Sequence, residues 1–184
     1  MTIALSIALG LGLSAACGFR IFIPLLALSA AAQAGQVTLA PGFDWIGTPP
    51  ALIVFAIAAI CEIAAYYFPA IDNLLDVAAT PAAVIAGTIL TASVAVELSP
   101  LLRWSLALIA GGGVAGIIHT ATSVTRATST ATTAGFGNLV VSKAEFIGSA
   151  TLSFLAILLP FAAMAVAIIL ISYGAIRMLK KRRP

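Results

Sequence analysis

The stretch "IALSIALGLGLSAACGFRIFIPLLALSAAAQA", residues 3–34, is apolar almost throughout, and it decides the class of fold. About 20 consecutive apolar residues suffice to cross a bilayer as a helix, so this run is longer than one crossing needs. Arg20 interrupts it near the middle, with Gly18 before it and Pro24 after it. Because proline removes a backbone donor and its ring collides with the preceding turn, we expect a broken or strongly kinked helix here.

The rest of the chain has the same apolar character. Of its 184 residues, 62% are hydrophobic and 8% are charged, and the mean hydropathy is +1.17. Soluble domains are about 25% charged, so this composition indicates an integral membrane protein. At about 20 residues per span plus loops, the chain has room for about five spans and no soluble domain. We therefore expect an all-α polytopic transmembrane fold, with residues 1–184 forming a single domain.

A second overlong apolar segment covers residues 104–133. It contains "GGGVAG" at 111–116 and then the polar stretch "HTATSVTRATSTATT" at 119–133. The glycines have the spacing of a dinucleotide-binding loop, but no strand precedes them, and Gly112 and Gly116 are better explained as a close helix-packing surface or hinge. We expect this segment to be broken or re-entrant too. Two such segments entering from opposite faces would form an inverted repeat.

Three ordinary spans are predicted over residues 50–68, 81–97 and 146–176, the second beginning at Pro81 and the third containing Pro160. The tail, residues 177–184, carries five basic side chains: Arg177, Lys180, Lys181, Arg182 and Arg183. Basic segments stay in the cytoplasm, so we expect a multi-pass protein of the bacterial inner membrane with its N-terminus outside and its C-terminus inside.

Ionisable residues fall in both overlong segments, Arg20 in the first and His119 in the second. At midplane depth an arginine costs about 2.5 to 3.5 kcal/mol on insertion scales. If the polar stretch is helical, one stripe of it holds a set of polar side chains, namely His119, Ser123, Arg126, Thr130 and Thr133. The other side holds small or apolar residues that we expect to pack closely on a neighbour, namely Ala121, Val124, Ala127 and Ala131.

Two interpretations of these buried cations stay open. In the first, the arginines pair with acids of this chain and the hydroxyls bond to their own backbone; the candidate acids are Glu62, Asp72, Asp76 and Glu97. In the second, an anionic ligand balances the charge, because Glu62 is the only acid expected deep inside a span. Arginine holds phosphate, sulfate or carboxylate bidentately, and broken helices direct N–H groups to the same place. The second interpretation predicts a midplane substrate site formed by Arg20, His119, Ser123, Arg126, Thr130 and Thr133.

Glu62 and His119 each have two roles open to them. Glu62 is either the counter-ion of an arginine or a carboxylate that couples transport to a proton. His119 suits a proton relay, but a hydrogen bond would also explain it. We expect a transporter or channel-like protein for a small anion or an anionic, phosphate-bearing lipid headgroup, with Glu62 and His119 as the proton-coupling residues. The alternative is a non-transporting structural or assembly protein whose polar residues form internal ion pairs.

Other chemistry has less support in the sequence. Asp72, Asn73 and Asp76 have oxygen ligands for a divalent cation but are better explained as helix caps, and we expect no metal. Cys17 and Cys61 lie in apolar windows, where we expect packing residues. The chain carries no G-x-S-x-G or H-E-x-x-H motif, so we expect no enzyme and no cofactor. The expected partners are membrane lipids, the anion or anionic lipid and a second copy of the chain, with no nucleic acid.

Three stretches also resemble a known family. They are "GFRIFIPLLALSA" at 18–30, "YYFPAIDNLLDVAATPAA" at 66–83 and "SVTRATSTATTAGFGN" at 123–138. Together they look like a family of small bacterial integral-membrane proteins known as domain of unknown function 4126. The resemblance extends over nearly the whole chain. It implies a compact multi-span membrane domain and brings no activity or site residue with it.

Overall fold

Helices joined by short loops make up this computed structural model. It describes residues 2–65, 69–133 and 136–181, and it describes side chains in these ranges except at 69–78 and 174–181. The elements are α1 (Ile3–Phe19), α2 (Phe22–Gln33), the 3-10 helix η1 (Asp44–Gly47), α3 (Pro49–Ala65), α4 (Pro69–Val94), α5 (Pro100–Leu106), the π-helical segment η2 (Ala107–Gly112), α6 (Gly113–Thr133), α7 (Asn138–Leu158) and α8 (Pro160–Lys181). The prediction of an all-α fold is confirmed.

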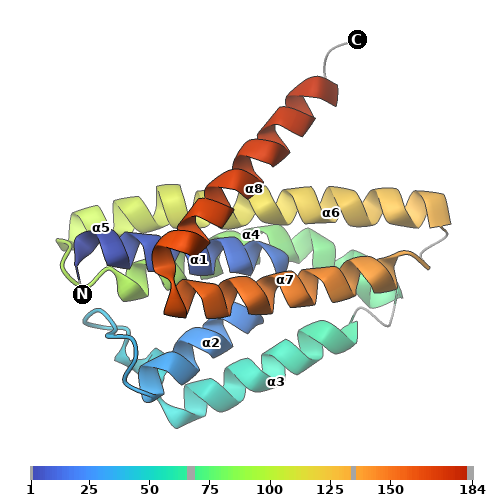
Figure 1. Cartoon of the computed structure of the whole chain (residues 1–184). Coiled ribbons are helices and arrows are strands. Elements are labelled where there is room, and N and C mark those ends of the chain that lie inside the picture. The colour runs from blue at the N-terminus through green and yellow to red at the C-terminus, as the bar shows by residue number, and fades with distance from the viewer. Residues whose placement is uncertain (1, 66–68, 134–135, 182–184) are drawn as a thin grey trace.

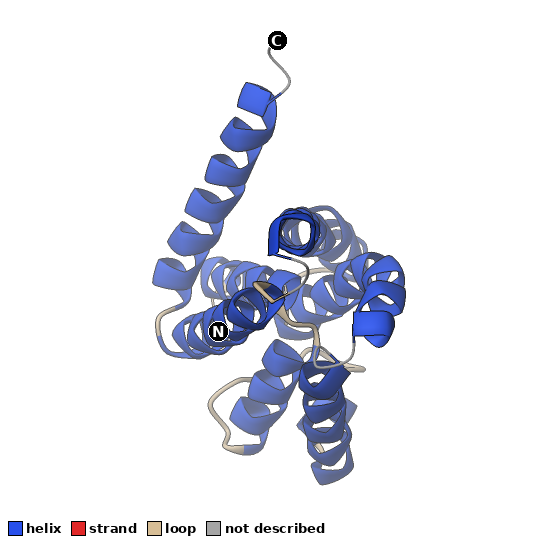
Figure 2. Cartoon of the chain, turned by 90° about the vertical axis from the view of Figure 1, so that its right-hand side faces the viewer, coloured by secondary structure: helices blue, strands red, loops and turns tan. Residues whose placement is uncertain are grey.

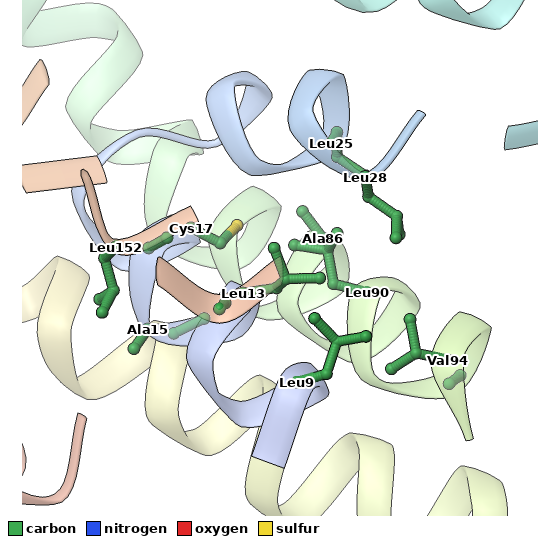
Figure 3. Packing of buried hydrophobic residues seen from close by; sticks show 14 of the residues in the cluster. Leu9, Leu13, Ala15, Cys17, Leu25, Leu28, Ala86, Leu90, Val94 and Leu152 are labelled. Atoms are coloured by element: carbon green, nitrogen blue, oxygen red, sulfur yellow. The ribbon is translucent and has the colours of Figure 1, made fainter. Parts of the chain in front are cut away.

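Helix α1 lies at the centre of the bundle. It packs against α4, α6, α7 and α8, and these helices surround it in Figure 1. A helix that is apolar on all sides is stable only when it is covered on all sides, and α1 meets this condition. Leu9 and Leu13 of α1 lie at most 2% exposed. Figure 3 shows these side chains among Leu25 and Leu28 of α2 and Leu90 of α4, which joins three helices in one core.

Glycines bring α4 within backbone contact of the η2–α6 region. A Cβ atom on Gly87 would lie 2.9 Å from the carbonyl oxygen of Gly111. A Cβ atom on Gly112 would lie 2.6 Å from Thr88 Oγ1, and one on Gly116 would lie 2.9 Å from Val84 Cγ2. Small residues let helix backbones approach this closely. The predicted close-packing surface at Gly112 and Gly116 is confirmed.

The first overlong segment folds as a helical hairpin. Helix α1 ends at Phe19 and α2 leads the chain back toward the end of the bundle where α1 began. The amide of Ala40, a few residues beyond α2, donates to Ser93 O at 2.7 Å, while Thr91 nearby donates to Gly10 O at 3.2 Å. The expected interruption is therefore present, and it reverses the chain.

The second overlong segment does not break. The helix runs without interruption from Pro100 to Thr133, and the predicted interruption near the glycines is present only as the π turn η2. A π turn absorbs one extra residue and keeps the helix continuous, which is why three glycines do not end it. This continuous helix and α7 are the two helices of the described chain that are long and apolar enough to cross a membrane.

Two prolines occupy different positions relative to the helix starts than the sequence predicts. Pro81 lies inside α4, which already begins at Pro69, so the span expected to start at Pro81 starts earlier. Pro160 begins a new helix and does not lie within a single span over 146–176. The residue before a proline is disfavoured in helical conformation, and Leu159 accordingly has φ −136° and ψ 69°.

Helix α8 leaves the bundle at a steep angle to the other long helices. Both views show its C-terminal half extending away from them (Figures 1 and 2). Ala163 and Ala167, in its first half, are buried at most 2% exposed. The basic tail continues α8 as far as Lys181, and its side chains and residues 182–184 lie outside the described part.

Candidate functional site

The break between α1 and α2 is one residue of extended backbone. Arg20 has φ −145° and ψ 128°, and it follows directly after the last residue of α1. Pro24 is in the first turn of α2, where a missing N–H is tolerated because that donor has no intrahelical partner. Pro24 therefore permits the start of α2. The interruption was predicted correctly, but its predicted cause is wrong. The chain bends at Arg20 and not at Pro24.

Glu62 of α3 caps the new helix. Its Oε1 accepts from the amide of Ile21 at 2.8 Å and its Oε2 accepts from the amide of Phe22 at 3.1 Å. These are among the N–H groups that a helix start leaves without intrahelical partners, and a carboxylate there is favoured by the helix dipole. The chain itself thus supplies an anion at the position where the sequence predicted an external one.

The carbonyl groups at the end of α1 are also satisfied by neighbouring helices. Ser149 Oγ of α7 donates to Ala16 O at 2.9 Å. His119 Nδ1 of α6 lies 3.3 Å from Gly18 O, and it donates there in the tautomer that carries the Nδ1 proton. His119 is 2% exposed. A buried helix end needs such partners, so α6 and α7 stabilise the break.

The side chain of Arg20 joins α1, α3 and α7. It is 1% exposed, and Nη2 donates to both Ser142 Oγ and Ser142 O, the latter at 3.1 Å. Nη1 donates to Glu62 O at 3.4 Å, and Nη2 lies 3.8 Å from Glu145 Oε2. An arginine at the break therefore fixes the positions of two helices that are remote in sequence.

Arg126 of α6 forms the second half of the cluster. It is 1% exposed, and its Nε lies 3.2 Å from Glu145 Oε1. The Glu62 carboxylate is attracted electrostatically by both Arg20 and Arg126. We call Arg20, Glu62, Arg126 and Glu145 the charged cluster. It contains two cations and two anions, and it links α1, α3, α6 and α7.

Glu145 is the residue that the sequence interpretation missed. Glu145 precedes the span predicted over 146–176, but it lies inside α7 and is 3% exposed. A signal was available, because Glu145, Ser149 and Ser153 recur every four residues and so share one face of a helix. Ser149 and Ser153 are buried too. A polar face on an otherwise apolar helix marks the side that faces polar partners.

The predicted polar stripe of α6 divides into two parts. His119 and Arg126 are buried, and Ser123 is half-buried with a buried Oγ. Thr130 and Thr133 are exposed and donate to the carbonyls of Arg126 and Ser129, four residues earlier. These two threonines therefore lie apart from the buried residues of the stripe. Such bonds to the helix's own backbone satisfy a hydroxyl without any ligand.

The opposite face of α6 is largely exposed in the part of the chain that the structure describes. Val124 is 49% exposed, and Ala127 and Ala131 are exposed as well. The prediction of close packing there is wrong, because α6 turns its polar residues inward to meet Glu145. Burying charges beside their counter-ions outweighs burying a few methyl groups.

The remaining acids and cysteines lie elsewhere. Asp72, Asn73 and Asp76 belong to the first turns of α4, but their side chains lie outside the described residues. Glu97 is exposed in the turn after α4 and is not part of the charged cluster. Cys17 is buried as expected, whereas Cys61 is exposed. Among the described side chains, no three His, Cys, Asp or Glu residues gather as metal ligands would.

A cavity of about 370 Å³ reaches the charged cluster from the side of α3 and α7. Arg20, Ser142 and Lys143 line its polar part, and the rest of the wall is apolar, formed by Ile63, Leu139, Phe146 and Ile147. The cavity offers two basic side chains next to hydrocarbon. Such a lining suits a molecule that has an anionic end and an apolar end.

Fold and site together define an all-α helical bundle with membrane-length apolar helices and a buried charged cluster at a helix break. The chain belongs to the family described as "Domain of unknown function (DUF4126)", which matches residues 7–181. No curated protein and no solved structure matches the chain.

Proposed function

We propose that this protein is a multi-pass carrier of the bacterial inner membrane that binds an anionic group at the break between α1 and α2. One observation carries the proposal: the 370 Å³ cavity has Arg20, a 1% exposed arginine, in its wall. Deeply buried ionisable residues in apolar helical bundles mark substrate or ion pathways by default. The basic tail supports a cytoplasmic C-terminus. The α1–α2 hairpin and the continuous α5–α6 helix differ in form, so a carrier with this binding site does not require an inverted repeat.

The charge of the cluster determines how an anion binds. With two arginines and two glutamates the cluster is neutral, so one added anion would leave it with an uncompensated negative charge. That charge is costly in a buried site unless a carboxylate takes up a proton. We assign this proton to Glu145, because an anion that binds the arginines takes them from this carboxylate, whereas Glu62 remains the cap of α2. Anion binding is thereby coupled to proton uptake, and affinity rises as pH falls.

The test is a binding titration at acidic and alkaline pH in mild detergent, using inorganic phosphate and the soluble lipid dihexanoyl phosphatidic acid as probes. We expect wild type to bind at least one probe, more tightly in acid. Glu145→Gln should bind equally at both pH values, since its neutral amide mimics the protonated acid. Glu97→Gln is the matched control and should keep the wild-type pH dependence.

Arginine variants locate the anion. Arg20→Gln should lose probe binding by about tenfold or more, the loss of about 1.4 kcal/mol expected for a charge-assisted hydrogen bond. Arg103→Gln, which replaces an arginine that donates to Ala95 O outside the cluster, should bind as wild type does. Absence of binding of either probe by wild type would refute the proposed function, as would equal behaviour of Glu145→Gln and Glu97→Gln.

A structural function is the second candidate, and the balanced charges favour it specifically. Breaking a buried ion pair costs about 3–5 kcal/mol, whereas replacing both partners by apolar residues is often neutral. Arg126→Met should therefore destabilise the protein, and the double variant Arg126→Met/Glu145→Leu should restore its stability. If the cluster is only structural, the stable double variant and wild type both fail to bind the probes. If it is a carrier site, wild type binds and the equally stable double variant does not.

A further inference from the structure

The cavity between α3 and α7 is far larger than a small inorganic anion requires. Its volume of about 370 Å³ is roughly twelve times the 30 Å³ or so that one water molecule occupies in the liquid. Its walls beyond Arg20, Ser142 and Lys143 are apolar side chains. A hydrated inorganic anion gains nothing from that part of the wall. We propose that the anionic group is the headgroup of a membrane phospholipid, whose acyl chain lies along α7; this inference rests on the proposed function.

The polar end of the cavity supplies what a phosphodiester needs. Arg20 is held in place by Ser142 and by the carbonyl of Glu62, so its guanidinium is preorganised. Lys143 is exposed and carries a flexible ammonium group at the same wall. Basic pockets between membrane helices bind phospholipid headgroups in this manner. The fixed guanidinium of Arg20 determines where the phosphate binds, and the flexible Lys143 adds positive charge near the opening of the cavity.

The apolar strip on α7 extends the site. Leu139, Lys143 and Ile147 are four residues apart, and Phe154 and Leu158 continue the same face two turns further on. Phe154, Ile157 and Leu158 line a second cavity of about 300 Å³, which α2 closes with Ala27, Ala30 and Ala31. The two cavities thus follow one another along a single face of α7. We call Leu139, Phe146, Ile147, Phe154 and Leu158 the α7 strip.

The length of the α7 strip fits an acyl chain. Fifteen residues separate Lys143 from Leu158, which is about 22 Å at 1.5 Å per residue. Half of a bilayer's hydrocarbon core is about 15 Å thick. Phe154, the first α7 residue that lines the second cavity, lies about 16 Å from Lys143 along the helix. A chain whose headgroup lies at Lys143 therefore reaches the start of the second cavity within about one leaflet, and Leu158 lies beyond that depth. Ile147 and Phe154 are 62% and 67% exposed, so a chain on this strip would cover apolar surface that the protein leaves open.

The headgroup position is near one end of the bundle. Ser142 and Glu145 are the fourth and seventh residues after Asn138, the first residue of α7, which puts them about 6 to 10 Å from that helix end. A phosphate can reach this level from the membrane surface without crossing the hydrocarbon core. Helix α3 packs mainly on α2 and η1, and α7 packs on α1 and α2. The space between α3 and α7 is consequently where a lipid has lateral access.

Native mass spectrometry of the full chain in mild detergent tests this inference. Dioleoyl phosphatidylglycerol and dioleoyl phosphatidylcholine are added at equal concentration, and inorganic phosphate is titrated in parallel. We expect wild type to retain phosphatidylglycerol at least about tenfold more strongly than phosphatidylcholine. Lys143→Glu should reduce retention by about tenfold, and Lys180→Glu is the charge-matched control. Ile147→Asn should reduce retention severalfold, and Ile169→Asn on α8 is the control for exposed apolar surface.

Different results distinguish a phospholipid site from a carrier site for small anions. The lipid site is established if wild type and both control variants retain phosphatidylglycerol and both α7 variants lose it. If phosphate binds in an Arg20-dependent way and phosphatidylglycerol is retained no better than phosphatidylcholine, the carrier proposal survives and the lipid inference is overturned. If neither probe binds, both are overturned. Retention that falls equally in Ile147→Asn and Ile169→Asn also overturns the lipid inference, because it would show unspecific contact.

Discussion

Two overlong apolar segments of this chain have opposite structures. Residues 3–34 break at Arg20 and reverse, whereas the helix from Pro100 to Thr133 stays continuous through three glycines and a π turn. The difference lies in the hydrogen-bond donors and acceptors that neighbouring helices offer to the backbone. At Arg20, α3, α6 and α7 provide Glu62, His119 and Ser149 for the backbone groups that the break exposes. At η2, α4 packs closely through Gly87, Thr88 and Thr91. The helix there is unbroken, so its backbone groups need no outside donors or acceptors.

The largest expected effect comes from removing the cap of α2. Glu62→Ala leaves the amides of Ile21 and Phe22 without their acceptor and takes one anion from the charged cluster. We expect the free energy of unfolding to fall by about 3–5 kcal/mol, the cost of breaking a buried ion pair. Unfolding in mixed micelles measures it. Glu97→Ala, at an exposed acid, should cost less than about 1 kcal/mol. Similar losses in both variants would mean that the break does not depend on Glu62.

An intermediate effect is expected on the continuous helix. A Cβ on Gly111 would lie 2.7 Å from the carbonyl oxygen of Gly87, whereas a Cβ on Gly113 meets nothing within 4 Å. Gly111→Ala should therefore lower the free energy of unfolding by about 1–3 kcal/mol through overpacking. Gly113→Ala should raise it by about 0.5 to 1 kcal/mol, because alanine favours helix over glycine. The same unfolding assay distinguishes the two, and effects of equal sign would contradict the close α4 contact.

The smallest effect is expected at the exposed threonines of α6. Thr130→Val removes a bond to the helix backbone and one from Asn138, both at the surface. Exposed substitutions of this kind change the free energy of unfolding by about 0.5 kcal/mol or less. Affinity for the phosphate and lipid probes should equal that of wild type, in contrast to Arg20→Gln. A marked loss of affinity in Thr130→Val would return this threonine to the substrate site.

The site was only partly predictable because its members are linked across helices. Several ionisable residues stand out in the sequence inside apolar segments, and the structure brings these three segments together; the residues are Arg20, Glu62, His119 and Arg126. Glu145 falls just before the span predicted over 146–176, so the sequence does not place it beside the arginines. Its true position depends on where α7 begins, and helix ends are poorly defined by local sequence. Without Glu145 the cluster has two arginines and one glutamate, and this imbalance is the basis of the predicted midplane anion site.

By itself, the sequence determined the all-α fold, the apolar helices, the interruption near Arg20 and the glycine packing surface, because these follow from composition and from backbone chemistry at single positions. Only the tertiary structure decided which apolar segment reverses, which carboxylate faces each arginine and where a cavity remains. Those features depend on contacts between residues far apart in the chain. Whether a helix can break inside an apolar bundle is determined by the donors and acceptors that other helices bring to it.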